Sequence, residues 1–160
     1  KLKTEKATID VNREQRTRLI DKARRFFPTF RDVRVAIIGL TFKPGTDDLR
    51  EAPAKQNIDI LLNEGADIIA WDPLGVENFR KRYPNCAINF AKDIDEALTD
   101  ADVCLIMTEW EKIVEYPLDN YKKYMKRPLV FDGRNCYKLS EAEKHEIFYD
   151  SIGRKIVDTL

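Results

Sequence analysis

Basic side chains occur at two places in this sequence where phosphate binding is expected. Lys43 and Arg50 lie in a charged loop between an apolar run that ends at Gly39 and an amphipathic segment. Arg134 follows a second apolar run, in the sequence FDGRN. An ammonium or guanidinium group at the mouth of a strand–helix turn, close to a helix N-terminus, is suited to binding phosphate. These residues therefore predict a site for an anion such as a diphosphate.

Other reactive residue types do not combine into a site. The chain has three cysteines, an odd number with no C-x-x-C pair, which argues against a disulfide framework or a zinc site. Cys104 lies inside an apolar run, where a thiol behaves as a small hydrophobe. The single histidine, His145, lies in a polar segment near the end, which favours a surface role. No catalytic residue and no metal ligand is predicted.

A dinucleotide-binding turn is also absent from the first apolar run. Gly39 is followed by Leu40, Thr41 and Phe42, which is not the G-x-G-x-x-G pattern. Asp72 ends the next apolar run, where an acidic residue that binds ribose could stand. Without the glycines, a turn-forming Asp-Pro is the favoured interpretation of that residue.

Short apolar runs alternate with amphipathic segments along the rest of the chain. Strands are predicted at residues 35–38, 67–72, 87–90, 103–107, 129–131 and 147–149. Helices are predicted at residues 11–27, 53–64, 76–83, 94–99, 118–125 and 141–146, with Asp10, Asp93 and Ser140 as N-caps, Pro53 at a first helical position and Gly65 as a left-handed cap. The pattern predicts an α/β fold, a doubly wound (Rossmann-like), mostly parallel sheet of about five or six strands flanked by helices, with an N-terminal helix.

Length and composition limit the remaining possibilities. The chain has 160 residues, 43% of them hydrophobic, which fits one domain with a core. The 28 basic residues balance the 28 acidic ones, so nothing suggests binding to nucleic acid or to an anionic membrane. No apolar stretch approaches the roughly 20 residues of a membrane span, and no signal peptide is visible. We expect a cytoplasmic protein, and the first residue, Lys1, suggests a piece of a longer chain.

Three ordered stretches resemble one known family. They are GLTFKPGTDDLREAP (residues 39–53), DADVCLIMTEW (100–110) and PLVFDGRNCY (128–137). From about Asp10 to its end, the chain is similar to the C-terminal, UDP-sugar-binding domain of the UDP-glucose/GDP-mannose dehydrogenase family. The FKP, TEW and FDGRN segments look more like the UDP-glucose 6-dehydrogenase branch than its relatives.

The resemblance implies a division of the chain and roles for particular residues. Residues 1–30 would be the end of the central helix between two domains, and residues 31–160 the UDP-sugar-binding α/β domain. Phe42, Lys43 and Arg134 would bind the substrate, UDP-glucose, and its product, UDP-glucuronate. Arg50 would reach across an interdomain cleft to the phosphates of the cofactor, NAD.

The resemblance also implies what the chain leaves out. The intact enzyme would be a homodimer that oxidises UDP-glucose to UDP-glucuronate with two NAD. Its nucleophilic cysteine belongs to a Gly-Gly-Ser-Cys-Phe type motif, which none of the three cysteines here has. That cysteine and the glycine-rich NAD turn would lie in an N-terminal NAD-binding domain of the same parent chain. The chain alone should therefore bind the substrate without catalysis.

Each candidate residue also has a structural interpretation. Lys43 could be a solvated surface lysine. Arg50 could pair with Asp47 or Asp48 and stiffen its loop, and Arg134 could be a turn arginine paired with Asp132. Core packing and loop anchoring are favoured for two further residues at the end of an apolar run, Glu109 and Trp110.

Three other functions stay open. The first is a sister activity, that of a UDP-N-acetylmannosamine or GDP-mannose dehydrogenase. The second, from another class, is a stand-alone nucleotide-binding or regulatory module without a catalytic partner. The third is a domain that only mediates contacts in an oligomer.

Overall fold

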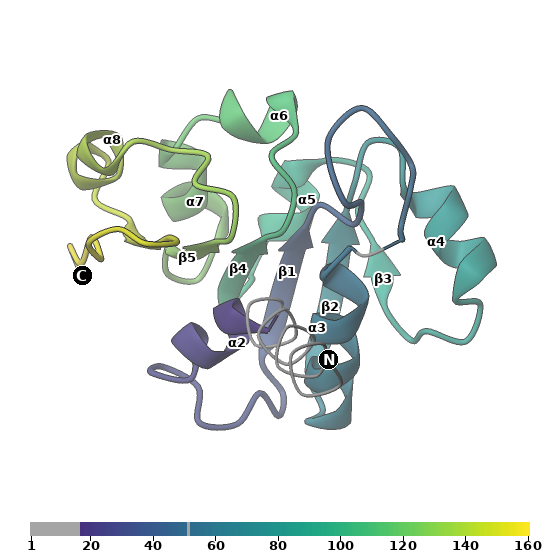
Figure 1. The fold of residues 1–160 in the computed structure, drawn as a ribbon. Coiled ribbons are helices and arrows are strands. Elements are labelled where there is room, and N and C mark those ends of the chain that lie inside the picture. The colour runs from purple at the N-terminus through teal and green to yellow at the C-terminus, as the bar shows by residue number, and fades with distance from the viewer. Residues whose placement is uncertain (1–16, 51) are drawn as a thin grey trace, which may run out of the picture.

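A parallel sheet of six strands lies in the middle of the computed structural model, which describes residues 17–50 and 52–160 (Figure 1). The strand order is β3-β2-β1-β4-β5-β6, and every neighbouring pair is parallel. The strands are β1 (Arg34–Ile38), β2 (Asp67–Trp71), β3 (Asn89–Phe90), β4 (Val103–Ile106), β5 (Leu129–Asp132) and β6 (Phe148–Asp150). The doubly wound, Rossmann-like prediction is confirmed.

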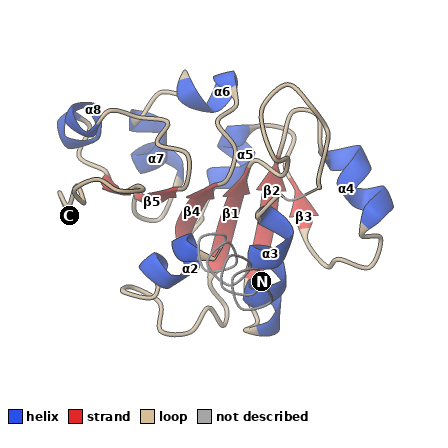
Figure 2. Ribbon diagram, in the orientation of Figure 1, coloured by secondary structure: helices blue, strands red, loops and turns tan. Residues whose placement is uncertain are grey.

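Helices cover both faces of this sheet (Figure 2). Buried residues of α2 (Arg18–Ala23), α3 (Ala54–Asn63) and α4 (Val76–Arg82) belong to the core on one face. Buried residues of α5 (Ile94–Leu98), α6 (Glu111–Val114), α7 (Asp119–Tyr124) and α8 (Leu139–Lys144) belong to the core on the other. Of the predicted N-terminal helix over residues 11–27, the described part is α2. Residues 1–16, which include the predicted cap Asp10, lie outside the described residues.

The apolar run of β1 is continuous because both of its faces are covered. Val35 and Ile37 pack into the core with α2 and α3, whereas Ala36 and Ile38 pack into the core with α5. All four are 0% exposed. A strand in the middle of a parallel sheet needs apolar residues at every position, which is the pattern that the sequence shows.

Helix α3 forms where the apolar spacing predicts it. Its buried side is Ala54, Ile58 and Leu61. As predicted, Gly65 closes the helix in a left-handed conformation: its φ is 91° and its N–H donates to the carbonyl of Leu62 at 3.0 Å. The predicted start is one residue too early, because Pro53 is the N-cap and Ala54 the first helical residue.

The later helices agree less closely with the sequence pattern. Asp93 caps α5 as predicted, since its carboxylate accepts the N–H of Glu96 at 2.8 Å. The predicted cap at Ser140 is wrong: α8 begins at Leu139, with Lys138 as its N-cap, so Ser140 lies inside the helix. The four-residue helix α6 was not predicted at all.

The strand order places the topological switch point between β1 and β4. The chain leaves β1 towards the face of α3 and leaves β4 towards the face of α6 and α7. Ligands of open α/β sheets bind beyond the carboxyl ends of the strands at such a switch point. The loops after β1, β4 and β5 are therefore the place to look for a site.

Candidate functional site

The loop after β1 and the loop after β4 are in direct contact at this edge of the sheet (Figure 1). A Cβ atom at Gly39 would lie 2.6 Å from the Cβ of Thr108, and the φ of Gly39 is 97°. The Thr108 hydroxyl donates a hydrogen bond to the carbonyl of Thr41 at 2.7 Å. Only glycine allows both this backbone conformation and this close approach, so Gly39 fixes where the charged loop begins.

A buried carboxylate joins these loops to the end of β2. Asp72, which is 5% exposed, accepts the N–H of Leu40 and the indole N–H of Trp110 at 2.8 and 3.0 Å. It also accepts the N–H groups of Leu74 and Gly75 at 2.9 and 2.6 Å, within its own turn. The turn-forming interpretation of Asp72 is confirmed, because these four donors occupy the carboxylate that a ribose would need.

Lys43 and Phe42 are exposed at the outer part of the loop after β1. The N–H of Phe42 donates a hydrogen bond to the carbonyl of Asp48 at 3.1 Å, and the residue is 43% exposed. The Thr41 hydroxyl donates to the carbonyl of Lys43 at 3.1 Å. Within residues 17–50 and 52–160, no hydrogen bond or ion pair of the Lys43 ammonium is found. Its charge faces solvent at the carboxyl edge.

Arg50 is held inside its own loop by Asp48. The guanidinium donates to both carboxylate oxygens, with its shortest bonds at 3.0 and 3.1 Å, and the Arg50 N–H donates to the same carboxylate at 2.9 Å. These hydrogen bonds lower the pKa of Asp48 to about 2, and the charge of Lys43 acts in the same direction. The Arg50 side chain is nevertheless 79% exposed. The structure therefore agrees with the alternative in which Arg50 pairs with an aspartate of its own loop and stiffens that loop.

Arg134 pairs with Glu109 from the loop after β4. Its Nε contacts Glu109 Oε2 and its Nη2 contacts Oε1 at 2.9 Å, so the pair is forked. The alternative in which the Arg134 side chain pairs with Asp132 does not describe the structure, because the contact of Arg134 with Asp132 is a hydrogen bond from its backbone N–H, at 2.8 Å. Glu109 does anchor a loop, as expected, but it lies at the surface and only Trp110 packs in the core.

Beneath Arg134, a buried network fixes the loop after β5. The Asp132 carboxylate is 0% exposed and accepts the N–H groups of Arg134 and Cys136 and the hydroxyl of Tyr149. Burial raises the pKa of Asp132, although these hydrogen bonds oppose the shift. Asn135 pairs with the backbone of Ile152 in both directions, at 2.8 and 3.0 Å. The backbone that carries Arg134 is thus held independently of the arginine side chain.

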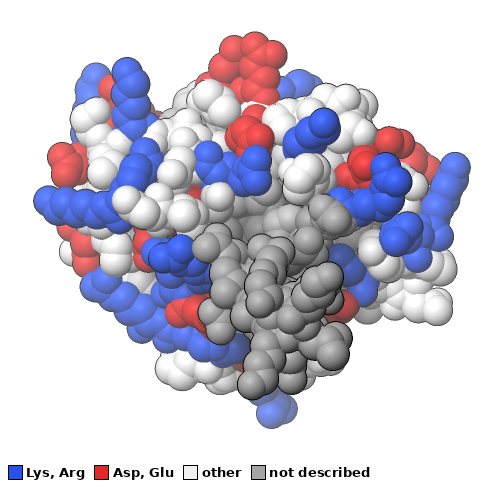
Figure 3. Space-filling model, viewed as in Figure 1, with Lys and Arg blue, Asp and Glu red and all other residues white. Residues whose placement is uncertain are grey.

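The structure brings the predicted basic residues to one edge of the sheet. Lys43 and Arg50 follow β1, Arg134 follows β5, and the loop after β4 links them through Thr108 and Glu109. Figure 3 shows basic and acidic side chains next to each other along the upper margin, where these loops lie. The edge is thus mixed in charge rather than strongly positive.

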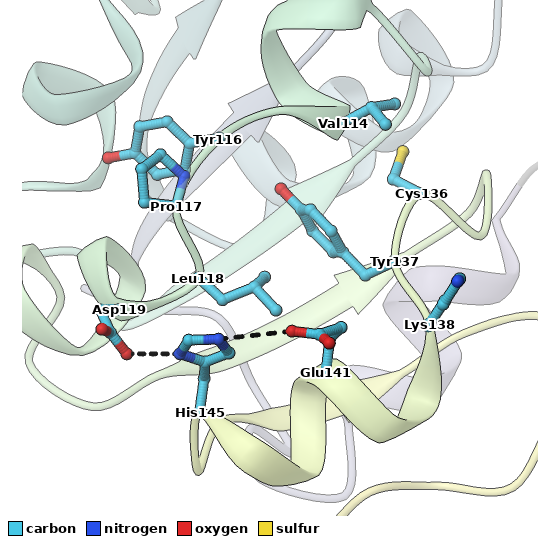
Figure 4. Close-up of a pocket in the computed structure, with 10 residues that line it drawn as sticks. All are labelled: Val114, Tyr116, Pro117, Leu118, Asp119, Cys136, Tyr137, Lys138, Glu141 and His145. Carbon is cyan, nitrogen blue, oxygen red and sulfur yellow. Dashed lines mark hydrogen bonds and ion pairs between the residues drawn. The ribbon is translucent and has the colours of Figure 1, made fainter.

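A separate cavity of about 440 Å³ lies beside α7 and α8 (Figure 4). His145 lies at its border, with Nδ1 2.7 Å from an oxygen of Asp119 and Nε2 3.5 Å from an oxygen of Glu141. A histidine that is occupied in this way by two carboxylates fits the predicted surface role. The thiol of Cys136 also lines the cavity, and burial raises its pKa.

The other two cysteines are equally unsuited to nucleophilic chemistry. Burial raises the pKa of Cys104, inside β4, and that of Cys86. A thiol with a raised pKa is protonated at neutral pH and reacts poorly. Among the described residues, no group of three or more His, Cys, Asp or Glu side chains could hold a metal ion, and no helix is long and apolar enough to cross a membrane.

A doubly wound, six-stranded parallel sheet in this strand order is the type of α/β domain found in dehydrogenases. The chain belongs to the UDP-glucose/GDP-mannose dehydrogenase family, whose UDP binding domain model matches residues 36–139. It is 41% identical over 152 residues to UDP-glucose 6-dehydrogenase YwqF of Bacillus subtilis and 42% identical over 124 residues to a UDP-glucose 6-dehydrogenase of Rhizobium meliloti. These matches cover 95% and 78% of this chain, but only 34% and 28% of the relatives.

A solved structure supports the same assignment. The UDP-glucose dehydrogenase of Pyrobaculum islandicum superimposes with a TM-score of 0.73 at 25% identity. The match covers 91% of this chain and 31% of the other. The chain thus spans about a third of the length of the proteins that it matches.

Proposed function

We propose that this chain is the UDP-sugar-binding part of an NAD-dependent UDP-glucose 6-dehydrogenase, which converts UDP-glucose to UDP-glucuronate with two NAD. The observation that carries the proposal is Lys43, an exposed ammonium without an ion pair among the described residues, at the carboxyl edge beside β1. It stands in one of the three stretches that resemble the family. The relatives named UDP-glucose 6-dehydrogenase support the substrate.

In this proposal, the basic residues bind and orient the nucleotide sugar. The Lys43 ammonium binds the diphosphate, for which a charge-assisted contact is the strong type of hydrogen bond. Arg134 contributes the N–H groups that Glu109 does not use. The exposed ring of Phe42 contacts the nucleotide, since the Phe42 N–H already donates to Asp48. Bound orientation, rather than proton or hydride transfer, is what these side chains supply.

The described residues do not fit a dinucleotide bound in the usual glycine-rich turn. After Gly39 the loop packs against Thr108, and α3 starts only at Ala54. We therefore assign no hydride transfer to this chain. In the parent enzyme, NAD would be held mainly by an N-terminal domain, with Arg50 reaching its phosphates, and the enzyme would act as a cytoplasmic homodimer. The pure chain should show no turnover of UDP-glucose with NAD; measurable turnover would contradict this division of labour.

Binding to Lys43 is tested by calorimetric titration of UDP-glucose. Lys43→Ala should weaken binding by about 1.5–3 kcal/mol, or tenfold to more than a hundredfold, because a charge-assisted contact is lost. Lys122→Ala, which removes an exposed lysine on α7, is the matched control and should leave the affinity unchanged. Equal affinities of wild type and Lys43→Ala for UDP-glucose would contradict the role of Lys43 in binding the diphosphate.

Two alternatives stay testable with the same protein. A sister activity on UDP-N-acetylmannosamine or GDP-mannose predicts tighter binding of those sugars than of UDP-glucose. A stand-alone module predicts a parent gene without a glycine-rich NAD turn or a nucleophilic cysteine. The name of the matching family keeps the GDP-mannose alternative in view.

A further inference from the structure

The basic residues of the carboxyl edge differ in how their charge is compensated. Arg50 is forked onto Asp48 and Arg134 is forked onto Glu109, whereas the Lys43 ammonium has no ion pair in the described residues. Asp47, in the same loop as Lys43, is exposed as well. Around the site, Lys43, Arg50 and Arg134 are thus balanced by Asp47, Asp48 and Glu109.

Glu109 is not needed to hold the backbone of the loop after β5. The N–H groups of that loop donate to buried Asp132, and Asn135 makes two hydrogen bonds to Ile152. These contacts fix the loop whether or not Arg134 is paired. The carboxylate of Glu109 therefore adds a negative charge to the site that the local fold does not require.

We propose that Glu109 makes this site select its ligand by charge, favouring a diphosphate esterified with a sugar over the same nucleotide with a free terminal phosphate. The inference rests on the proposed function, in which Arg134 contacts the ligand. A UDP-sugar carries about two negative charges, whereas UDP carries about three and UTP about four near neutral pH. Each extra negative charge on the ligand must come close to the Glu109 carboxylate, because that carboxylate is already bound to Arg134.

Coulomb's law gives the size of the effect. At a separation of about 8 Å and an effective dielectric constant of about 40, repulsion by Glu109 weakens binding on the order of fivefold for each extra charge. The discrimination should fade at high salt, because ions screen charges at a half-exposed site. A change in the orientation of Arg134 can also alter these affinities, so a variant that keeps the charge of Glu109 is needed to separate the two effects.

The test measures the dissociation constants of UDP-glucose, UDP and UTP for wild type and Glu109→Gln at low and high salt. At low salt, Glu109→Gln should improve the affinity for UTP relative to UDP-glucose on the order of 25-fold, and that for UDP on the order of fivefold, and high salt should reduce both changes. Glu109→Asp keeps the charge and should keep the selectivity of the wild type. Far-UV circular dichroism and the unfolding midpoint check that both variants fold.

Glu64→Gln is the matched control. Glu64 forms the same kind of forked pair with Arg24, at 2.5 and 3.1 Å, but at the opposite edge of the sheet, beside the start of β1. It changes the net charge equally and should leave the ratio unchanged. A shift of the ratio in Glu64→Gln equal to that in Glu109→Gln would overturn the proposal.

The remaining outcomes separate this inference from the proposed function. If the wild type binds UDP-glucose and the ratio does not change in Glu109→Gln, charge selection by Glu109 is wrong while UDP-sugar binding stands. If Glu109→Asp loses the selectivity as completely as Glu109→Gln, the shape of the pair matters and charge does not. If the wild type binds none of the three nucleotides, both proposals fail.

Discussion

The loop after β1 and the loop after β5 both present an arginine at the carboxyl edge, but they are held in different ways. In the first, Arg50 pairs with Asp48 two residues away, and a hydrogen bond from Asn78 to the carbonyl of Asp47 ties the loop to α4. In the second, Arg134 pairs with Glu109, 25 residues away, over a buried carboxylate. The first arginine is paired within its own loop, whereas the second is paired with a residue from a distant part of the chain.

This difference separates adaptable from fixed parts of the site. A loop held by local, exposed contacts can change its conformation at little cost in stability. A loop held by buried hydrogen bonds cannot move without leaving polar groups unpaired. We therefore expect the loop with Lys43 to adjust to a ligand, while Arg134 keeps its position.

The largest difference in stability between the two loops is expected for a substitution at Asp132. Asp132→Ala removes the acceptor of three donors beneath Arg134 and should lower the free energy of unfolding by about 3–5 kcal/mol. Urea unfolding followed by circular dichroism measures the change. Asp48→Ala, in the exposed loop after β1, is the control and should leave the urea midpoint close to that of the wild type. Similar losses in the two variants would mean that the loops are held equally firmly.

Two glycines sharpen the comparison within the loop after β1. Gly39→Ala should destabilise the fold by about 2–3 kcal/mol more than Gly45→Ala. Both glycines have a positive φ, but only a Cβ at Gly39 meets Thr108, whereas a Cβ at Gly45 meets nothing within 4 Å. Thermal unfolding of the two variants gives the difference. Equal midpoints of thermal unfolding would show that the start of the loop accommodates a Cβ as easily as its tip does.

The smallest expected effect is the pH dependence of the pair between Arg50 and Asp48. The pKa of Asp48 is lowered from 3.8 to about 2 in the folded chain, so the pair stabilises the loop above pH 3.8 and is lost as the pH falls through about 2. Arg50→Ala should return this pKa towards 3.8. An NMR titration of the Asp48 carboxyl group measures it. A pKa near 2 that survives in Arg50→Ala would assign the shift to another cause.

Much of the fold could be predicted from the sequence because the strands are buried on both faces. Continuous apolar runs such as Val35–Ile38 and Val103–Met107 have few other structures open to them. Local signals also held where a single residue determines the geometry, as at Asp93 and Gly65. Ser140 misled because its favourable cap chemistry is outweighed by the packing that starts α8 at Leu139.

The connections between loops could not be predicted in the same way. The pairing of Arg134 with Glu109 depends on how far β4 and β5 extend and where their loops turn, which no local pattern encodes. The same holds for the hydrogen bond from Thr108 to Thr41, which spans 67 residues of sequence. The sequence therefore indicated the basic residues and a loop-anchoring role for Glu109, but it did not predict that Glu109 pairs with Arg134.

Asp72 has a consequence for how variants of this protein should be interpreted. Its carboxylate brings the ends of β1, β2 and β4 together, yet its donors leave no place for a ligand. A substitution there would abolish recognition by displacing several loops at once, and a screen scored only by activity would count it among the contact residues. The stability of every inactive variant must therefore be measured, to tell whether the variant has lost a ligand contact or the arrangement of the loops at this edge.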